Sequence, residues 1–312
     1  MAVHHFQPTV YYTAIGTYPP VLEIQSGDTV VTTTVDSAGR DGQDQQVTPR
    51  GNPQTGPFLI QDAEAGDIVS IHFDHLSPNR KIGRTSTTIA PNVLDPHYVA
   101  SQMPSGGGAE WEIDLGAWTA KLISPENQIS NLHIPLEPMV GCFGVAPPRE
   151  QSISTATSAT HGGNMDYRGF AEGVTVYFPI FVPGALFYLG DGHAAQGDGE
   201  IVGTGIEISF DVQFTVQLIK GRDIGWPRAE DQNYIMTVGN ARPLDQALQH
   251  ATTEMVCWLV DLGLEKSAAH ILLGQCIEYD VGNVFDPAYT MICKIKKRTL
   301  EQVGIWPSAV WP

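Results

Sequence analysis

The chain has 312 residues, of which 42% are hydrophobic, so it can bury a sizeable core in one large β domain or two smaller ones. Its 34 acidic and 17 basic residues give a net charge of −17, which argues against binding to nucleic acids or to anionic membranes. No apolar run approaches the roughly 18 residues that a membrane helix needs, and the N-terminus lacks the pattern of a signal peptide. We therefore expect a cytoplasmic protein with no nucleic-acid or membrane partner.

The first two thirds of the chain show the pattern of short β-strands. Two units share one order: an apolar run, a small residue, Gly-Asp and a second apolar run. This order is typical of strands joined by a tight turn. The strands predicted from it cover residues 21–24, 29–35, 58–61 and 68–73.

Residues 78–108 follow as a long segment that we expect to be mostly irregular, and strand character returns at 207–219. Apolar residues from Leu244 to Leu262 then follow helical spacing, and a second helix is predicted at 266–276. Strands resume at 290–295. The expected domains are a β-rich body at 1–232, which carries the site, and an α+β portion at 233–312 packed on it.

A glycine-spaced run, YLGDGHAAQGDGEIVGTGIE, covers residues 188–207. Interior glycines weaken strands, so the run is a poor choice for a plain structural strand. Its carboxylates, imidazole and amide indicate a metal or polar-substrate site, and the alternative is a solvated hairpin loop. The polar residues in question are Asp191, His193, Gln196, Asp198, Glu200 and Glu207.

Familiar catalytic motifs are absent, including G-x-S-x-G, H-E-x-x-H, the P-loop and G-x-G-x-x-G. The four cysteines are scattered, which argues against a disulfide scaffold and a thiolate zinc site. Cys142 lies between apolar neighbours, a setting that disfavours a reactive thiolate.

Three further segments are rich in polar groups: Asp36 at the end of a predicted strand, NPQTGP at 52–57 and HGGNMD at 161–166. The two glycines of HGGNMD let the backbone bend sharply and turn its amides toward a ligand. Taken alone, a tight structural turn would also explain that segment.

Together these segments resemble the acetamidase/formamidase family. The resemblance also rests on PPVLEIQSGDTV, DAEAGD, PMVGCFGVAPP and FPIFVPGALFYLGDGHAAQGDGEI, which occur in family order from about Pro19 onward. It implies a jelly-roll-like β-sandwich with an appended α+β portion, and a homodimer or higher assembly. It also implies hydrolysis of a small amide, such as formamide or acetamide, to ammonia and a carboxylate, with a bound divalent cation.

Amide hydrolysis without a serine or cysteine nucleophile favours a metal-activated water. Asp191 and His193 are two residues apart, so on an extended chain they point to the same side and can supply two ligands. Asp36, at another strand end, is the predicted third ligand. A carboxylate–imidazole set suits zinc and a carbonyl–carboxylate set suits calcium, and the sequence leaves this choice open.

Three carboxylates are candidates for general acid or base: Asp198, Glu200 and Glu207. Burial beside Ile201 and Val202 would raise the pKa of Glu200, whereas Glu207 has the alternative of an ordinary outward strand residue. The residues predicted to hold the substrate are His161, Gly162, Gly163, Asn164 and Gln196.

Two other functions stay open. One is a non-catalytic jelly roll that binds a small molecule or a sugar on an aromatic platform of Tyr98, Trp111 and Trp118. The other is an amidohydrolase with a larger substrate, selected by residues 78–108. The complete HGGNMD and GDGHAAQGDGE runs favour the small-amide enzyme.

Overall fold

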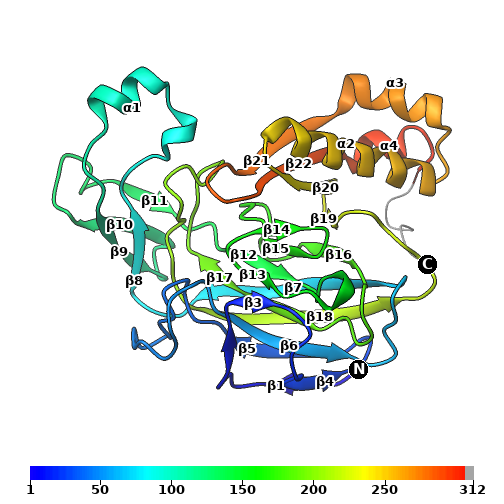
Figure 1. The fold of residues 1–312 in the computed structure, drawn as a ribbon, viewed down its shortest axis with the longest axis horizontal. Coiled ribbons are helices and arrows are strands. Elements are labelled where there is room, and N and C mark those ends of the chain that lie inside the picture. Colours follow the sequence, from blue (N-terminus) through cyan, green and yellow to red (C-terminus); the bar gives the residue numbers. More distant parts are fainter. Residues whose placement is uncertain (306–312) are drawn as a thin grey trace.

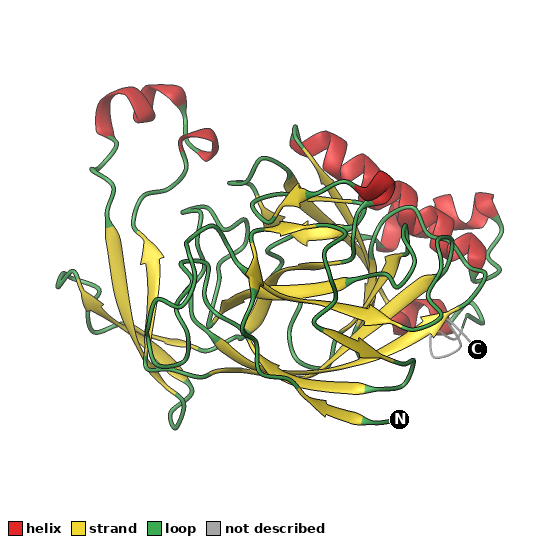
Figure 2. Ribbon diagram, turned by 60° about the horizontal axis from the view of Figure 1, so that its bottom comes forward, coloured by secondary structure: helices red, strands yellow, loops and turns green. Residues whose placement is uncertain are grey.

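The structure is a computed structural model, which describes residues 1–305 and is built mainly from β-strands (Figure 1; Figure 2). The largest sheet has nine strands, and only its β1–β5 edge is parallel. Across this sheet the order is β1 (Val3–His5), β5 (Thr29–Thr33), β18 (Phe210–Ile219), β7 (Ile68–Pro78), β16 (Thr175–Pro179), β19 (Arg228–Glu230), β20 (Tyr234–Ala241), β22 (Tyr289–Lys296) and β21 (Glu278–Asn283).

A seven-stranded sheet faces the central strands of this sheet, and aromatic side chains fill the space between the two. Phe143 meets Phe73 edge to face with ring centroids 5.1 Å apart, and Phe187 meets Phe214 at 5.3 Å. Its strands are β14 (Ser158–Ala159), β15 (Gly162–Asn164), β12 (Met139–Gly144), β17 (Phe187–His193), β6 (Gln54–Ile60) and β2 (Tyr11–Tyr12), with β4 (Leu22–Ile24) paired to β6.

Residues 78–108 are more ordered than predicted. They contain a strand, a single 3-10 turn and a helix, and the helix stands away from the body of the protein (Figure 1). The strand escaped prediction because Ile82 is its only large apolar residue, so it shows no alternation. These elements are β8 (Ile82–Ser86), η1 (Pro91–Val93) and α1 (Pro96–Gln102). Strand β8 forms a four-stranded sheet, in the order β11-β10-β9-β8, with the strands that follow: β9 (Gly108–Asp114), β10 (Thr119–Ser124) and β11 (His133–Pro135).

The C-terminal helices cover the strands β20 and β22, as Figure 1 shows. The two longer ones confirm the predicted helices: α2 (Leu244–Asp261) and α3 (Lys266–Cys276). A second hydrophobic cluster lies between these helices and strands, and Trp258 on α2 is fully buried in it. The remaining short elements are β3 (Ala14–Ile15), β13 (Ile153–Ser154), η2 (Pro148–Glu150) and α4 (Lys297–Glu301).

The prediction of a mainly β protein with C-terminal helices is thus confirmed. The jelly-roll type and the division after residue 232 stay predictions, and residues 306–312 of the predicted second portion lie outside the described residues. The C-terminal strands β20–β22 extend the nine-stranded sheet of the body. None of the helices in residues 1–305 has the length and apolarity needed to cross a membrane.

Candidate functional site

Six buried ionisable side chains meet in the interior of the protein. They form three overlapping groups, and in each group the candidate ligand atoms lie within 4.8 Å of one another. Five are carboxylates and one is an imidazole, so the site is strongly acidic. We call it the acidic cluster: Asp166, Asp191, His193, Glu200, Glu207 and Asp286.

Strand β17 supplies two members of the acidic cluster, Asp191 and His193. The interior glycines of the run at 188–207 predicted no plain strand; residues 188–193 nevertheless lie in β17, which is buried throughout, whereas residues 194–207 belong to no named strand. The backbone of β17 is irregular, because Asp191 has a φ of 63° and the register with β6 shifts between Phe187 and Leu189. Glu200 and Asp166 also have positive φ values, 47° and 42°. Such strained backbone is costly for residues other than glycine and gathers at functional sites.

Gly141 on β12 has no side chain, and side chains of the acidic cluster occupy the space beside its Cα. It lies between the Val140–Gly192 and Cys142–Gly190 pairs of the β12–β17 ladder. A Cβ atom at this position would lie 2.3 Å from Asp166 Oδ1, 2.9 Å from Asp191 Oδ2 and 3.2 Å from His193 Cε1. The glycine is therefore required by close packing against the site.

The amide of Gln196 sets the orientation of the His193 ring. Its Nε2 donates to two backbone carbonyls, Asp166 O at 2.6 Å and Gly282 O at 3.3 Å. A carbonyl can only accept, so Gln196 Oε1 must accept from His193 Nδ1, 2.8 Å away. The hydrogen-bond network thus assigns the proton of a neutral His193 to Nδ1 and leaves a lone pair on Nε2.

This Nε2 faces two carboxylates. It lies 2.9 Å from Glu207 Oε1 and 3.4 Å from Asp191 Oδ1. Burial lowers the pKa of His193, but these two carboxylates outweigh burial and hold the pKa well above its usual value. The position next to Nε2 therefore favours a positive charge, either a proton or a cation.

Four carboxyl groups of the acidic cluster are destabilised as anions. Burial and neighbouring carboxylates raise the pKa of Asp166 and Glu200 well above the ordinary values. Burial is also the main cause of the raised pKa of Glu207 and Asp286. Buried carboxyl groups in such number must either take up protons or be compensated by positive charge.

Neutral amides hold three of these carboxylates in place. Asn52 Nδ2 donates to Asp191 Oδ2 at 2.8 Å. Asn283 Nδ2 donates to Asp166 Oδ2 at 2.9 Å. The third contact joins Asn164 Nδ2 to Asp286 Oδ2 at 2.6 Å. These donors orient the carboxylates without neutralising them.

The acidic cluster fits a divalent cation. Within residues 1–305, Asp166 Oδ1 and Glu207 Oε2 are buried without a hydrogen-bond partner, and buried His193 Nε2 has only the Glu207 and Asp191 carboxylates beside it. Oxygen and imidazole donors of this kind bind zinc, and the carboxylate-rich part of the set also suits calcium.

Of the residues predicted from sequence, the structure brings Asp191, His193, Glu200 and Glu207 together. Gln196 contacts the cluster through His193. Asn164 contacts it through Asp286, and its own Oδ1 accepts from Asn52 Nδ2 at 2.7 Å.

The other predicted substrate residues lie in or next to β15, which β12 separates from β17 in the same sheet. Gly162 and Gly163 pair with β12 as part of β15. His161 is fully buried, and neither ring nitrogen has a hydrogen-bond partner among the described residues. Burial lowers the pKa of His161 to about 4, so this imidazole is neutral at physiological pH.

Two predicted residues are not brought to the acidic cluster. Asp36, the predicted third ligand, directs Oδ2 to Arg80 Nη2 at 2.5 Å and accepts the backbone N–H of Arg40 on Oδ1. Asp198, a predicted acid or base, has a side chain that is 66% exposed and lies 3.6 Å from Arg168.

Sequence reasoning counted Asp166 only among the polar groups of HGGNMD, and it gave no role to Asp286, Asn283 or Gly141. Asp166 ends the HGGNMD segment and Gly141 lies in PMVGCFG, so proximity to recognised segments was a signal for both. Asp286 and Asn283 come from the turn between β21 and β22, where no local pattern marks them.

A cavity of about 430 Å³ adjoins this site. The β8–β11 sheet and the segment after β17 form its walls, and Gln196 and Gly205 place it beside His193: a Cβ on Gly205 would lie 2.5 Å from the His193 ring. Trp111 lines the cavity, whereas the other two residues of the predicted aromatic platform, Tyr98 and Trp118, are not among its lining residues. The full lining is Thr85, Ser86, Trp111, Ile134, Pro135, Glu137, Arg168, Ala195, Gln196, Gly197, Val202, Thr204, Gly205 and Ile206.

Fold and site together define a mainly β protein with a buried carboxylate–imidazole centre beside an open cavity. Comparison with known proteins identifies the family to which the chain belongs. The model of the acetamidase/formamidase family matches residues 149–295. The chain belongs to this family, because a solved acetamidase from Yersinia enterocolitica is 30% identical to it over 96% of this chain and 93% of that one, with a TM-score of 0.82.

A solved acetamidase from Bacillus halodurans is equally similar, at 30% identity over 96% of this chain and all of that one, with a TM-score of 0.81. A putative formamidase from Schizosaccharomyces pombe is 25% identical over 53% of this chain and 51% of its own length. The chain spans about half the length, or less, of the curated relatives it matches.

Proposed function

We propose that this protein is an amidase that hydrolyses a small linear amide to ammonia and a carboxylate, with a divalent cation held by Asp191 and His193. The observation that carries the proposal is the position of His193 Nε2, a buried nitrogen that faces the carboxylates of Asp191 and Glu207. Membership of the acetamidase/formamidase family and the names of the solved relatives support the reaction class.

Within this proposal the residues have separate tasks. Asp191 and His193 are the principal ligands, and Asp166 and Glu207 lie close enough to complete the set. When bound, a divalent cation lowers the pKa of a water molecule and polarises a carbonyl group. Gln196 fixes the His193 tautomer, and Glu200 is the buried carboxyl best placed to hold and release a proton beside these ligands.

The test is ammonia release from formamide and acetamide by wild-type protein, with and without a chelator, together with the metal content of the purified protein. Asp191→Ala and His193→Ala should lose both the bound cation and hydrolysis while they keep the wild-type circular dichroism spectrum. Full activity and wild-type cation content in both variants would refute the proposal. A cytoplasmic location and a homodimeric or higher assembly stay predictions.

A second candidate is hydrolysis of a larger amide. The cavity of about 430 Å³ favours it, because cavities of roughly 300 Å³ and above hold drug-sized ligands. Trp111, Ile134 and Ile206 offer apolar surface for an acyl or amine substituent. A lower KM for butyramide or benzamide than for acetamide, lost in Trp111→Ala, would favour this candidate. No release of ammonia from any amide would favour the non-catalytic binding protein.

A further inference from the structure

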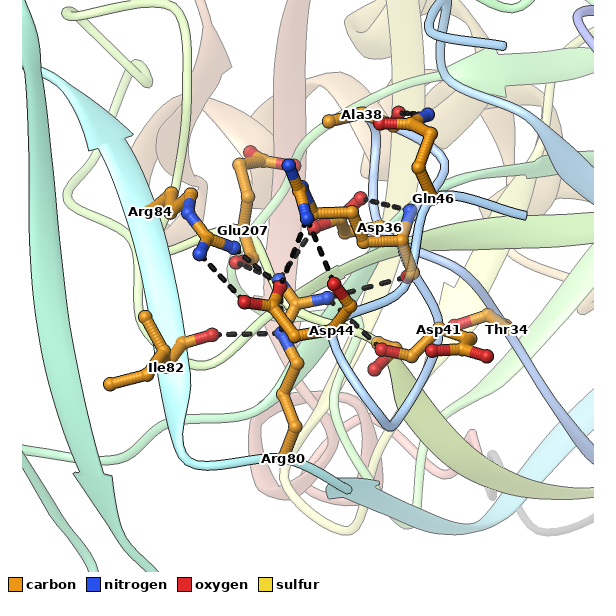
Figure 3. A network of polar contacts seen from close by, with 12 residues as sticks. Thr34, Asp36, Ala38, Asp41, Asp44, Gln46, Arg80, Ile82, Arg84 and Glu207 are labelled. Carbon is orange, nitrogen blue, oxygen red and sulfur yellow. Dashed lines mark hydrogen bonds and ion pairs between the residues drawn. The ribbon is translucent and has the colours of Figure 1, made fainter. Parts of the chain in front are cut away.

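A buried arginine lies directly outside the acidic cluster, between β7 and β8 (Figure 3). The side chain of Arg80 is 3% exposed, and each of its five N–H donors has an acceptor. The acceptors are Ile82 O on Nε at 2.8 Å, Arg40 O and Asp41 O on Nη1 at 3.3 Å each, and Asp36 Oδ2 at 2.5 Å and Glu207 O at 3.3 Å on Nη2.

One of these contacts reaches the acidic cluster through the backbone. Arg80 donates to the carbonyl of Glu207, the residue whose carboxylate lies 2.9 Å from His193 Nε2. The same carbonyl accepts the N–H of Arg84 at 3.1 Å, and the N–H of Glu207 donates to Arg84 O at 2.9 Å. Hydrogen bonds from Arg80 and Arg84 thus fix the backbone at Glu207, and Figure 3 shows these two arginines beside it.

The other contact reaches the cluster through a loop. Asp36 begins the segment 36–52, and the carbonyl of the next residue, Ser37, accepts the N–H groups of Gly51 and Asn52 at 3.3 and 3.0 Å. The two ends of the loop are therefore tied together. Asn52, at the far end, has a φ of 56° and donates to Asp191 Oδ2 at 2.8 Å.

We propose that the Arg80–Asp36 pair is a positioning element for the acidic cluster. It holds Glu207 directly and Asp191 through the 36–52 loop, so that the two carboxylates stay on either side of His193 Nε2. The proposal rests on the proposed function, in that the carboxylates are held for a cation. Arg80 acts through other residues. In this proposal Asp36 is a positioning residue and not the metal ligand that the sequence predicted.

Lysine cannot replace this arginine. The guanidinium is a planar fork whose five donors meet five acceptors from three segments of chain, whereas an ammonium group offers three donors from a single point. Residues behind the ligands of a metal site change metal affinity or activity about 10- to 100-fold when they are replaced. We expect losses of this size in Arg80→Ala and Arg80→Lys.

The experiment measures the affinity of the metal-free protein for Zn²⁺ and for Ca²⁺ by titration calorimetry, and amide hydrogen exchange at residues 51–52 and 207 by mass spectrometry. Arg80→Ala should bind the preferred cation about 10- to 100-fold more weakly and exchange faster at both places. Added guanidinium chloride at non-denaturing concentration should restore part of the affinity in Arg80→Ala and none in Arg80→Lys.

A matched control separates positioning from stability. Arg228 forms another buried pair, with its Nε 2.6 Å from Glu254 Oε1 and its side chain 2% exposed, outside the acidic cluster. Arg228→Ala should lower the melting temperature and leave cation affinity within about threefold of wild type, because its contacts lead to α2 and not to the site.

Wild-type affinity and wild-type exchange in Arg80→Ala would overturn the proposal. If that variant does not fold, Asp36→Asn decides, since it keeps the side-chain volume and removes the charge paired with Arg80. If the wild-type protein binds neither cation, the proposed cation site fails, and unchanged hydrogen exchange in the Arg80 and Asp36 variants would separately overturn the positioning role.

Discussion

Replacing Gly141 with alanine inserts a methyl group into the acidic cluster. The added carbon would lie 2.3 Å from Asp166 Oδ1 and 2.9 Å from Asp191 Oδ2, and ordinary contact begins at 3.4 Å. The Asp166 carboxylate must therefore move by about 1 Å. A displacement of this size in a catalytic site can cost about 100-fold in rate, whereas overpacking costs about 1–3 kcal/mol of stability.

The assay compares kcat/KM for ammonia release, bound cation and melting temperature in Gly141→Ala and wild type. Gly274→Ala is the control, because Gly274 lies in α3 with no atom within 4 Å of an added Cβ, and alanine favours a helix by up to about 1 kcal/mol. We expect a loss of about 100-fold in kcat/KM for Gly141→Ala and none for the control. Wild-type activity and cation content in Gly141→Ala would refute the role given to Asp166 and Asp191.

Three further outcomes are expected. Gln196→Leu frees the His193 tautomer and should weaken cation binding about 10- to 100-fold at constant circular dichroism; wild-type affinity would contradict this. Cys142→Ala should keep hydrolysis within about threefold, because burial and the nearby Asp191 raise the pKa of this thiol and keep it from ionising; a loss above about 100-fold would reveal a catalytic thiol. Burial opposes ionisation of Asp28, but hydrogen bonds from His4 and backbone amides prevail and lower its pKa from 3.8 to about 2. Its contribution is therefore present above pH 4 and lost as the pH falls toward 2, so Asp28→Asn should cost about 1–2 kcal/mol at pH 7, after allowance for solvent screening, and the difference from wild type in urea unfolding should vanish near pH 2.

The parts of the site that sequence predicts are those concentrated in one short run. Asp191 and His193 are two residues apart on β17, and the structure places both in the acidic cluster. The helix at 266–276 was equally readable, because its apolar spacing needs no distant partner. The glycine-rich strand β17 was not predicted, since its glycines are required by close packing and not by a bend.

Other members of the site depend on contacts between distant segments. Asp286 enters the cluster only because β21 and β22 extend the nine-stranded sheet to the site. Asp36 has the composition and position of a ligand at a strand end, yet Arg80, 44 residues away, occupies its carboxylate. No local pattern reveals that partner, because its effect arises from tertiary structure.

The central claim is that a cation is bound at His193 Nε2. An anomalous difference map measured at the zinc absorption edge, from crystals grown with Zn²⁺, tests it most directly. The account predicts a peak about 2.0–2.1 Å from His193 Nε2, with carboxylate oxygens of the acidic cluster around it, and no peak there in His193→Ala. A map in which the bound zinc lies elsewhere, with His193 Nε2 in contact only with carboxylates, would contradict it.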